Sequence, residues 1–372
     1  MTPSSSANLL DVRALADPYP LYEALRATGP VIYLEHHEVW AVTGHRAIHT
    51  AHRLGTLTRQ AVTGPGHDPR PHRDRHRTPH PETGTTTGPG IGPGAGGRAR
   101  QVLEENTHAG VLDAAACARQ FAAGTVMALA GLPAGAAPRL PPGRPAAAAL
   151  TSALHTTPAP TSGSPLTGTD PGAPGRPTGA DQGPPPDVLC ALEHLDTTIA
   201  GLTETIWQLA HHPIQWAALR AAPARLARAA LAEALRREPP LTHEAFTTTM
   251  PTRLPGVRIP AGQVVWLLYG AAGRDRNVWG PDADAFNIHR PHPHDPLALR
   301  PPGLCPGTEL ALEQAVSLLG ALAGQARALA PAGDPVRIPG PLRTYAFAPV
   351  TTRPTFDPDP GPGRGPEAGA GP

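Results

Sequence analysis

Apolar residues along the chain recur with the spacing of amphipathic helices in several stretches, and near the N-terminus they also form short β-rich runs. After a turn-forming start, Leu21, Tyr22 and Leu25 predict a short helix within residues 17–29. Residues 31–42 hold two runs of β-branched, aromatic and apolar residues separated by charged ones, which predicts a hairpin. The N-terminal part is therefore expected to combine helix with a small β element.

Periodic stretches return later in the chain. Helices are predicted near residue 47 and within residues 98–132, 187–210, 214–237 and 308–330, and strands within residues 257–270. Two helices are expected in the first of the long stretches, and the second is expected to be one long helix. The fold class that follows is mainly α with a small β region.

Three stretches lack such periodicity. Residues 63–97, 133–186 and 357–372 are dominated by Pro, Gly and other small or polar residues. The whole chain holds 50 prolines and 40 glycines among 372 residues, a share that is typical of low-complexity segments. These stretches are expected to be disordered, within a chain that otherwise forms a single domain over residues 1–372.

Charge and cysteine usage narrow the class of protein. The formal net charge is +1, so no overall field favours nucleic acid or an anionic membrane as a partner. No targeting signal precedes Leu10, and no run reaches the roughly 18 apolar residues of a membrane span. Cys117, Cys190 and Cys305 lie far apart, which fits a reducing compartment. A cytoplasmic protein is expected.

Cys305 has the most distinctive local context. It lies in a stiff loop of prolines and glycines, residues 301–307, directly before the helix predicted at 308–330. A helix N-terminus carries unpaired N–H groups and a partial positive charge, which stabilise a thiolate and lower its pKa. A metal ligand or a nucleophile is one interpretation, and a small buried apolar residue is the other.

Two further segments accompany this cysteine in a characteristic order. They are Asp196-Thr197-Thr198 within the long helix and Glu233-x-x-Arg236 within a later helix, and the segment of the cysteine itself reads Cys305-x-Gly307-x-x-Leu310-Ala311. Together they resemble the bacterial, soluble type of the cytochrome P450 family, in a divergent form. The resemblance covers roughly residues 14–50, 100–132 and 187–355. It implies the cytochrome P450 fold.

The resemblance also implies roles for these residues. Cys305 would be the thiolate ligand of the iron of haem b, Thr197 would stabilise iron-bound oxygen and Asp196 would feed protons towards it. Glu233 and Arg236 would tie a neighbouring loop to the core beneath the haem. Alternatively, this pair is an exposed pair one turn apart on a helix, worth only about 0.2–0.5 kcal/mol.

The chain also departs from the family pattern. Bulky Glu193 and His194 precede Asp196, where the family has small residues, and they could crowd the oxygen site. His72, His76 and Arg77 are similar to the family's contacts with the haem propionates once the register is stretched by one residue. The same segment allows a metal site of histidines at 72, 76 and 80, or simply a solvated basic loop, because nearby prolines disfavour a helix that would present ligands.

The function expected from the resemblance is that of a haem-thiolate monooxygenase, an oxidoreductase of secondary metabolism. It would insert one oxygen atom from O2 into a small organic substrate, with electrons from a separate ferredoxin or flavoprotein. A second hypothesis is a non-catalytic relative that stabilises a partner enzyme such as a glycosyltransferase. A third is a decayed chain that folds poorly.

Overall fold

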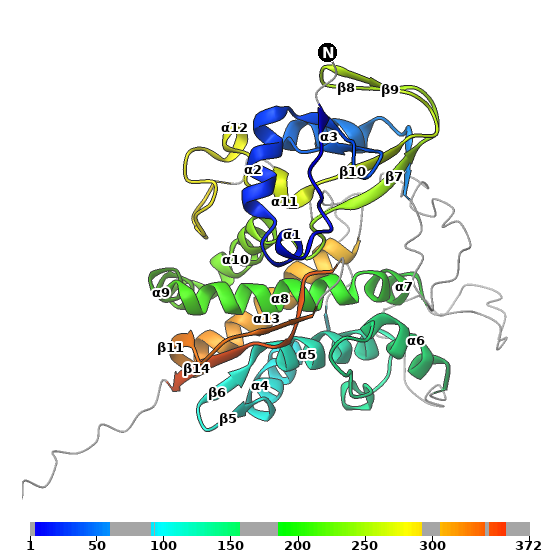
Figure 1. Cartoon of the computed structure of the whole chain (residues 1–372). Helices are drawn as coiled ribbons and strands as arrows, with labels where there is room; N and C mark the ends of the chain where they lie inside the picture. The colour runs from blue at the N-terminus through cyan, green and yellow to red at the C-terminus, as the bar shows by residue number, and fades with distance from the viewer. Residues whose placement is uncertain are drawn as a thin grey trace, which may run out of the picture.

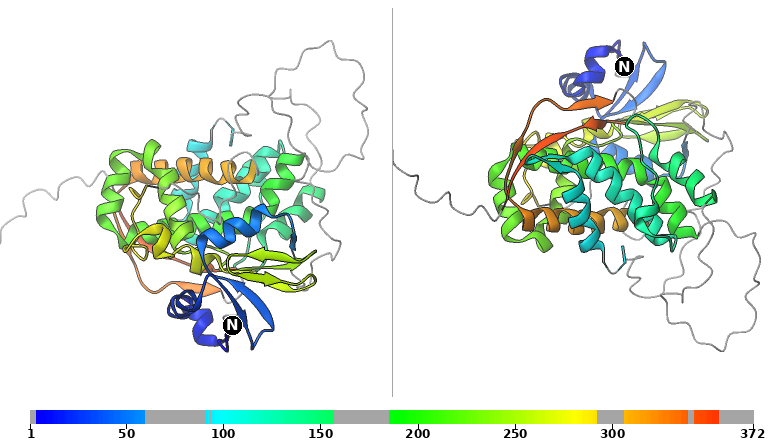
Figure 2. Two further views of the ribbon diagram at one scale, coloured as in Figure 1. Left: turned by 90° about the horizontal axis from the view of Figure 1, so that it is seen from above. Right: turned by 90° about the horizontal axis from the view of Figure 1, so that it is seen from below.

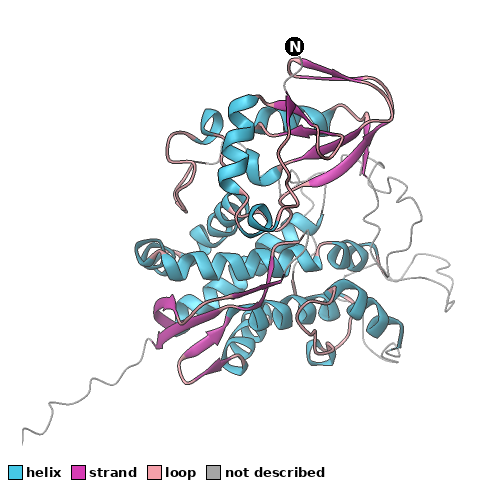
Figure 3. Ribbon diagram, viewed as in Figure 1, coloured by secondary structure: helices cyan, strands magenta, loops and turns pink. Residues whose placement is uncertain are grey.

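The computed structural model describes residues 4–59, 91–92, 94–156, 185–291, 306–338 and 342–354. Figure 1 shows a long helix, α8 (Leu195–His211), crossing the middle of the molecule between a sheet-bearing N-terminal part and a layer of helices from residues 94–156. Figure 3 shows that helix is the main component and that the strands gather in two places. The predicted fold class, mainly α with a small β region, is confirmed.

The first sheet unites segments from both halves of the chain. Its order is β1-β2-β3-β10-β7-β4, formed by Ser4–Ser5, Val31–Leu34, Val39–Val42, Val264–Leu267, Glu244–Thr248 and Leu57–Arg59. The hairpin of β2 and β3 is antiparallel, whereas β10 pairs parallel to β3 and antiparallel to β7. Apolar side chains of both central strands pack against the helices α2 (Tyr19–Thr28) and α3 (His45–Arg53). The N-terminal hairpin is thereby fixed to strands about 200 residues later in the chain.

Smaller sheets lie elsewhere. The second sheet has the order β11-β14-β6-β5, formed by Ala326–Pro331, Pro349–Pro354, Val111–Asp113 and Thr107–His108. Two hairpins complete the strands: β8 with β9 (Thr252–Leu254 and Val257–Ile259) and β12 with β13 (Val336–Ile338 and Thr344–Phe347).

The largest apolar core lies among the long helices. It is built by α4 (Ala95–Glu105), α5 (Ala114–Leu129), α8, α10 (Pro223–Arg237) and α13 (Pro306–Gln325). Figure 2 shows α13 alongside α10 and α4 in two opposite views. Every residue of α8 from Thr198 to Ala210 is buried, as expected for a helix enclosed by others. At Gly201 this helix approaches α10 so closely that an added Cβ would lie 2.9 Å from Leu235.

The remaining helices are short or lie at the edges of these layers. They are α1 (Val12–Ala16), η2 (Ala134–Ala136), α6 (Ala146–Thr156), α7 (Pro186–Glu193), α9 (Pro213–Ala221), α11 (Tyr269–Ala272) and α12 (Arg276–Trp279). Among the residues that the structure describes, no helix is both long and apolar enough to cross a membrane.

Several predicted elements need correction at their ends. The helix expected over residues 187–210 is interrupted at His194 and divided into α7 and α8. The helix expected to reach residue 330 ends at Gln325, where the chain continues as strand β11. Within residues 133–186, the described part includes α6, whose alanine-rich sequence has little amphipathic contrast and was not recognised as a helix. The hairpin from Thr107 to Asp113 also escaped prediction, because its strands are only two and three residues long.

Candidate functional site

The junction between α7 and α8 is a break in an otherwise continuous helical path. α7 ends at Glu193, His194 adopts φ −99° and ψ −1°, and α8 begins at the next residue. The hydroxyl of Thr197 donates a hydrogen bond of 2.9 Å to the carbonyl oxygen of His194. A threonine that bonds back to the preceding turn is a known cause of local helix distortion. The break therefore coincides with the Asp196-Thr197 segment singled out in the sequence.

Asp196 points towards a different helix. Its carboxylate accepts hydrogen bonds from the backbone N–H groups of Ala146 (2.7 Å) and Ala147 (3.4 Å), at the beginning of α6. A carboxylate at this position satisfies N–H groups that have no partner within their own helix. Burial raises the pKa of Asp196, and the two N–H groups offset part of that rise. The structure thus gives Asp196 a contact that links α8 to α6.

The beginning of α13 lies directly against the junction. A Cβ added to Gly307 would lie only 2.3 Å from Cδ2 of His194, so the imidazole is in contact with this glycine. Gly307 is two residues beyond Cys305 in the chain. Segments more than 100 residues apart, the Asp196-Thr197 segment and the chain that follows Cys305, are therefore brought side by side.

Glu233 and Arg236 form the centre of a buried polar network. The guanidinium of Arg236 donates to both carboxylate oxygens of Glu233, at 2.7 and 2.9 Å. Its remaining N–H groups donate to the carbonyl oxygens of Gly273, Ala283 and Ala285. Both side chains are at most 1% exposed. An exposed helix pair, one of the two readings of the sequence, does not describe this geometry.

Arg290 is a third member of the network that sequence reasoning missed. Its Nε donates to Glu233 at 3.1 Å, and its other groups bond to Asp282 and to the carbonyl of Trp279. Glu233 also accepts the backbone N–H of Asn287. The signal in the sequence was an arginine four residues after Phe286, a segment noted only for its phenylalanine. Residues 273–290 are thereby tied to α10.

The other predicted site residues lie outside the described part of the chain. These are Cys305, His72, His76 and Arg77, together with His80 of the alternative metal site. Within the described ranges, no three His, Cys, Asp or Glu side chains gather in a way that could hold a metal ion. Cys117 and Cys190 are buried, and burial raises the pKa of the Cys117 thiol, which disfavours a thiolate there.

Haem requires both a donor set and a space. A cysteine of the kind that could be a donor, Cys305, is present in the sequence, and the α7–α8 junction lies next to the helix that follows it. The space is not open, because the imidazole of His194 fills the gap between the α7–α8 junction and Gly307. In this conformation the described residues do not fit a porphyrin between these two elements.

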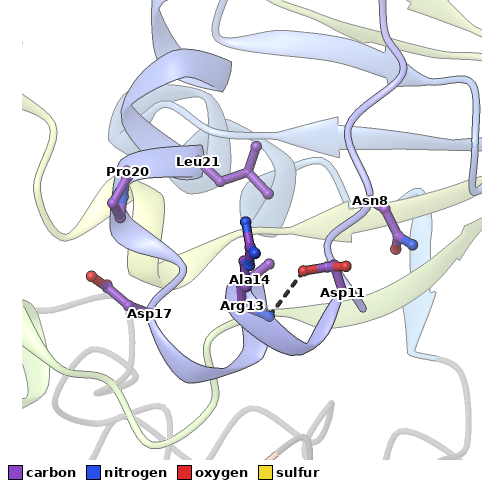
Figure 4. Close-up of a pocket in the computed structure, with 7 residues that line it drawn as sticks. All are labelled: Asn8, Asp11, Arg13, Ala14, Asp17, Pro20 and Leu21. Atoms are coloured by element: carbon purple, nitrogen blue, oxygen red, sulfur yellow. Dashed lines mark hydrogen bonds between the residues drawn. The ribbon is translucent and has the colours of Figure 1, made fainter.

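A surface hollow of about 540 Å³ lies elsewhere, at the N-terminal helices. Figure 4 shows the side chains around it, with Asp11 accepting the backbone N–H of Arg13 at the start of α1. All of its lining residues fall between Asn8 and Leu21, and none comes from α7, α8 or α13. The hollow is therefore separate from the junction described above.

Comparison with known proteins places these features in a family. Residues 193–306 match the family model described as cytochrome P450. The chain is similar to protein TylM3 of Streptomyces fradiae, with 30% identity over 87% of this chain and 82% of that protein. It is also similar to protein DesVIII of Streptomyces venezuelae, with 36% identity over 42% of this chain. A linalool 8-monooxygenase of Pseudomonas putida is 36% identical over 26% of this chain. The matches span only 39% of DesVIII and 23% of the monooxygenase.

The fold is also similar to that of solved cytochrome P450 structures. The substrate-free cytochrome P450 CYP150A6 of Mycobacterium marinum superimposes with a TM-score of 0.66 at 20% identity, over 94% of this chain and 99% of that one. Membership of this family implies haem, with its iron, as the cofactor. Taken with the similarity to TylM3 over 87% of this chain, the match to the family model shows that the chain belongs to the cytochrome P450 family.

Proposed function

We propose that the chain is a haem-thiolate monooxygenase that inserts one oxygen atom from O2 into a small organic substrate. The observation that carries the proposal is the position of Asp196 and Thr197 in a chain of the cytochrome P450 family. This acid and this alcohol lie at the α7–α8 junction, next to the beginning of α13, the helix that follows Cys305 in the sequence. A thiolate on one side and proton-donating groups on the other are what this chemistry needs.

The described residues support separate parts of this role. The raised pKa of Asp196 favours its protonated form, which suits a group that passes on protons. Thr197 holds the break in the helix through its bond to the His194 carbonyl. The network of Glu233, Arg236 and Arg290 fixes residues 273–290, which precede the Cys305 segment. We infer that this network positions the cysteine loop.

Partners follow from the chemistry. Haem iron held by the thiolate of Cys305 would supply the activation of O2, with electrons delivered by a second protein. A separate ferredoxin or flavoprotein is proposed as the electron donor. The substrate is proposed to be a small molecule of secondary metabolism.

The proposal is tested by the carbon-monoxide difference spectrum of the reduced protein, with haem supplied during expression. Wild type should give the Soret band of a thiolate-ligated iron, and Cys305→Ser should lose it. Cys190→Ser, a buried cysteine of α7, is the matched control and should keep the band. A wild-type protein that carries haem without this band would refute the proposal.

The filled gap favours a second candidate function. Since His194 occupies the space between the junction and Gly307, the chain could act without haem, as a non-catalytic P450-like protein that stabilises a partner enzyme such as a glycosyltransferase. Retention of Cys305 gives this candidate no support, because a scaffold has no use for a thiolate. It predicts a haem-free chain that melts cooperatively and raises the melting temperature of the partner enzyme in a mixture.

A further inference from the structure

His194 stands at a point where two helices meet with almost no space between them. Its ring lies against the backbone of Gly307, and the three ring atoms nearest to an added Cβ there would be 2.3 to 3.1 Å away. These distances are shorter than any ordinary contact, so even one additional methyl group cannot be accommodated without movement of the ring. The side chain fills the gap completely at this point.

The backbone that carries this ring is held in place. The carbonyl of His194 accepts hydrogen bonds from the Thr197 hydroxyl (2.9 Å) and from the Thr198 N–H (2.8 Å). Its own N–H donates to the carbonyl of Cys190 at 3.2 Å. Asp196 anchors the next turn to α6. With the main chain held in this way, the imidazole would have to leave the gap by rotation of its side chain.

We propose that the imidazole of His194 is a plug that closes the haem slot in the haem-free protein and must swing out before haem can load. This inference rests on the proposed function, because it concerns the same site. In the closed state the imidazole lies in the gap against Gly307, whereas a porphyrin requires an open state in which the ring has left the gap. Haem affinity is then reduced by the fraction of molecules in which the slot is open.

The packing part of the proposal is tested without any haem, by thermal melts of a double-mutant cycle. Gly307→Ala alone should lower the melting temperature by about 2–4 °C, because the new methyl group collides with the ring. In the His194→Ala background the same change should cause no loss, since alanine is the better helix former. An equal loss in both backgrounds overturns the plug.

A matched control lies on the same helix. His211 ends α8 and packs against Trp207, with its Nδ1 at 2.9 Å from the Trp207 carbonyl. In the His211→Ala background, Gly307→Ala should cost as much as it does in wild type. If Gly307→Ala causes no fall in melting temperature in the His211→Ala background either, the fall in wild type arises from the stability of α8 in general. This result would overturn the inference.

The loading part is tested by titrating each haem-free protein with haemin and following the Soret absorbance. His194→Ala should bind at least about tenfold more tightly than wild type, and His211→Ala should match wild type. Equal affinities for wild type and His194→Ala overturn the plug, even if the thiolate band is present. Tighter binding by His194→Ala without a thiolate-type carbon-monoxide band supports the plug and refutes the monooxygenase. Failure of His194→Ala to take up haem overturns the plug as well.

Discussion

The Glu233–Arg236–Arg290 network and the α7–α8 junction serve the same expected site, yet they are built in opposite ways. In the network, charged side chains are at most 7% exposed and hold carbonyl groups of a long loop through hydrogen bonds. At the junction, the bulky imidazole of His194 lies against Gly307, and the acid bonds to a neighbouring helix.

The difference reflects how freely each region can change. A buried ion pair leaves an uncompensated charge when one member is lost, so its members are tightly constrained together. At the junction, the side chains of Asp196 and Thr197 bond to backbone groups, which accept many arrangements. The network is therefore expected to tolerate fewer substitutions than the junction.

The largest effect is expected in the network. Arg236→Ala should lower the free energy of unfolding by about 3–5 kcal/mol, because it leaves Glu233 buried without its main partner. Arg228→Ala is the matched control, since Arg228 pairs with Glu309 at 41% and 34% exposure and should cost at most about 1 kcal/mol. Urea unfolding of both variants measures the contrast, and similar losses would contradict the distinction between buried network and surface pair.

At the junction, Asp196→Ala should cost about 0.5–2 kcal/mol, because the first N–H groups of α6 lose their acceptor. Asp187→Ala, in the exposed first turn of α7, is the control and should change stability by less than about 0.5 kcal/mol. Urea unfolding gives both values. Equal effects would mean that the capping bonds of Asp196 contribute nothing to the link between α8 and α6.

Thr197→Val should have a smaller cost, about 0.5–1.5 kcal/mol, since it removes one hydrogen bond and keeps the shape of the side chain. Thr50 makes the same kind of bond to Arg46 in the uninterrupted helix α3, where water can replace it. Thr50→Val should therefore cost less in the same unfolding measurement. A larger loss of unfolding free energy for Thr50→Val than for Thr197→Val would show that the Thr197 bond does not stabilise the fold more than an ordinary exposed bond does.

The sequence also predicted the network better than it predicted the junction. Helical spacing predicted a helix over the residues of α10, and the resemblance to the family singled out its E-x-x-R pair, whereas burial of the pair came from the fold. Arg290 escaped, since its distance along the chain from Glu233 follows no period. At the junction, the bulk of His194 suggested crowding, but only the fold could reveal that Gly307 is what it meets. The turn of Asp196 towards α6 was hidden as well, because α6 itself was not recognised.

The smallest expected effect is a slope with pH at Asp196. Burial raises the pKa of this carboxyl above its ordinary value of 3.8, so the folded chain holds a proton that the unfolded chain releases. Its contribution to stability is then complete below 3.8 and is lost as the pH rises through the folded-state pKa. Asp196→Asn has no such proton, so the stability of wild type relative to this variant should fall across that window.

Urea unfolding of both proteins at intervals from about pH 4 to pH 7 measures this slope, and the difference between them cancels the titration of all other groups. A relative stability that rises with pH instead would mean that the N–H groups of Ala146 and Ala147 outweigh burial and lower the pKa. Asp196 would then be a capping carboxylate that stays ionised, and the junction would resemble the network in having its charge fully compensated. If the stability of wild type relative to Asp196→Asn falls as the pH rises, burial outweighs the N–H groups and raises the pKa of Asp196. The junction then differs from the network, because its acid is not fully compensated by its partners.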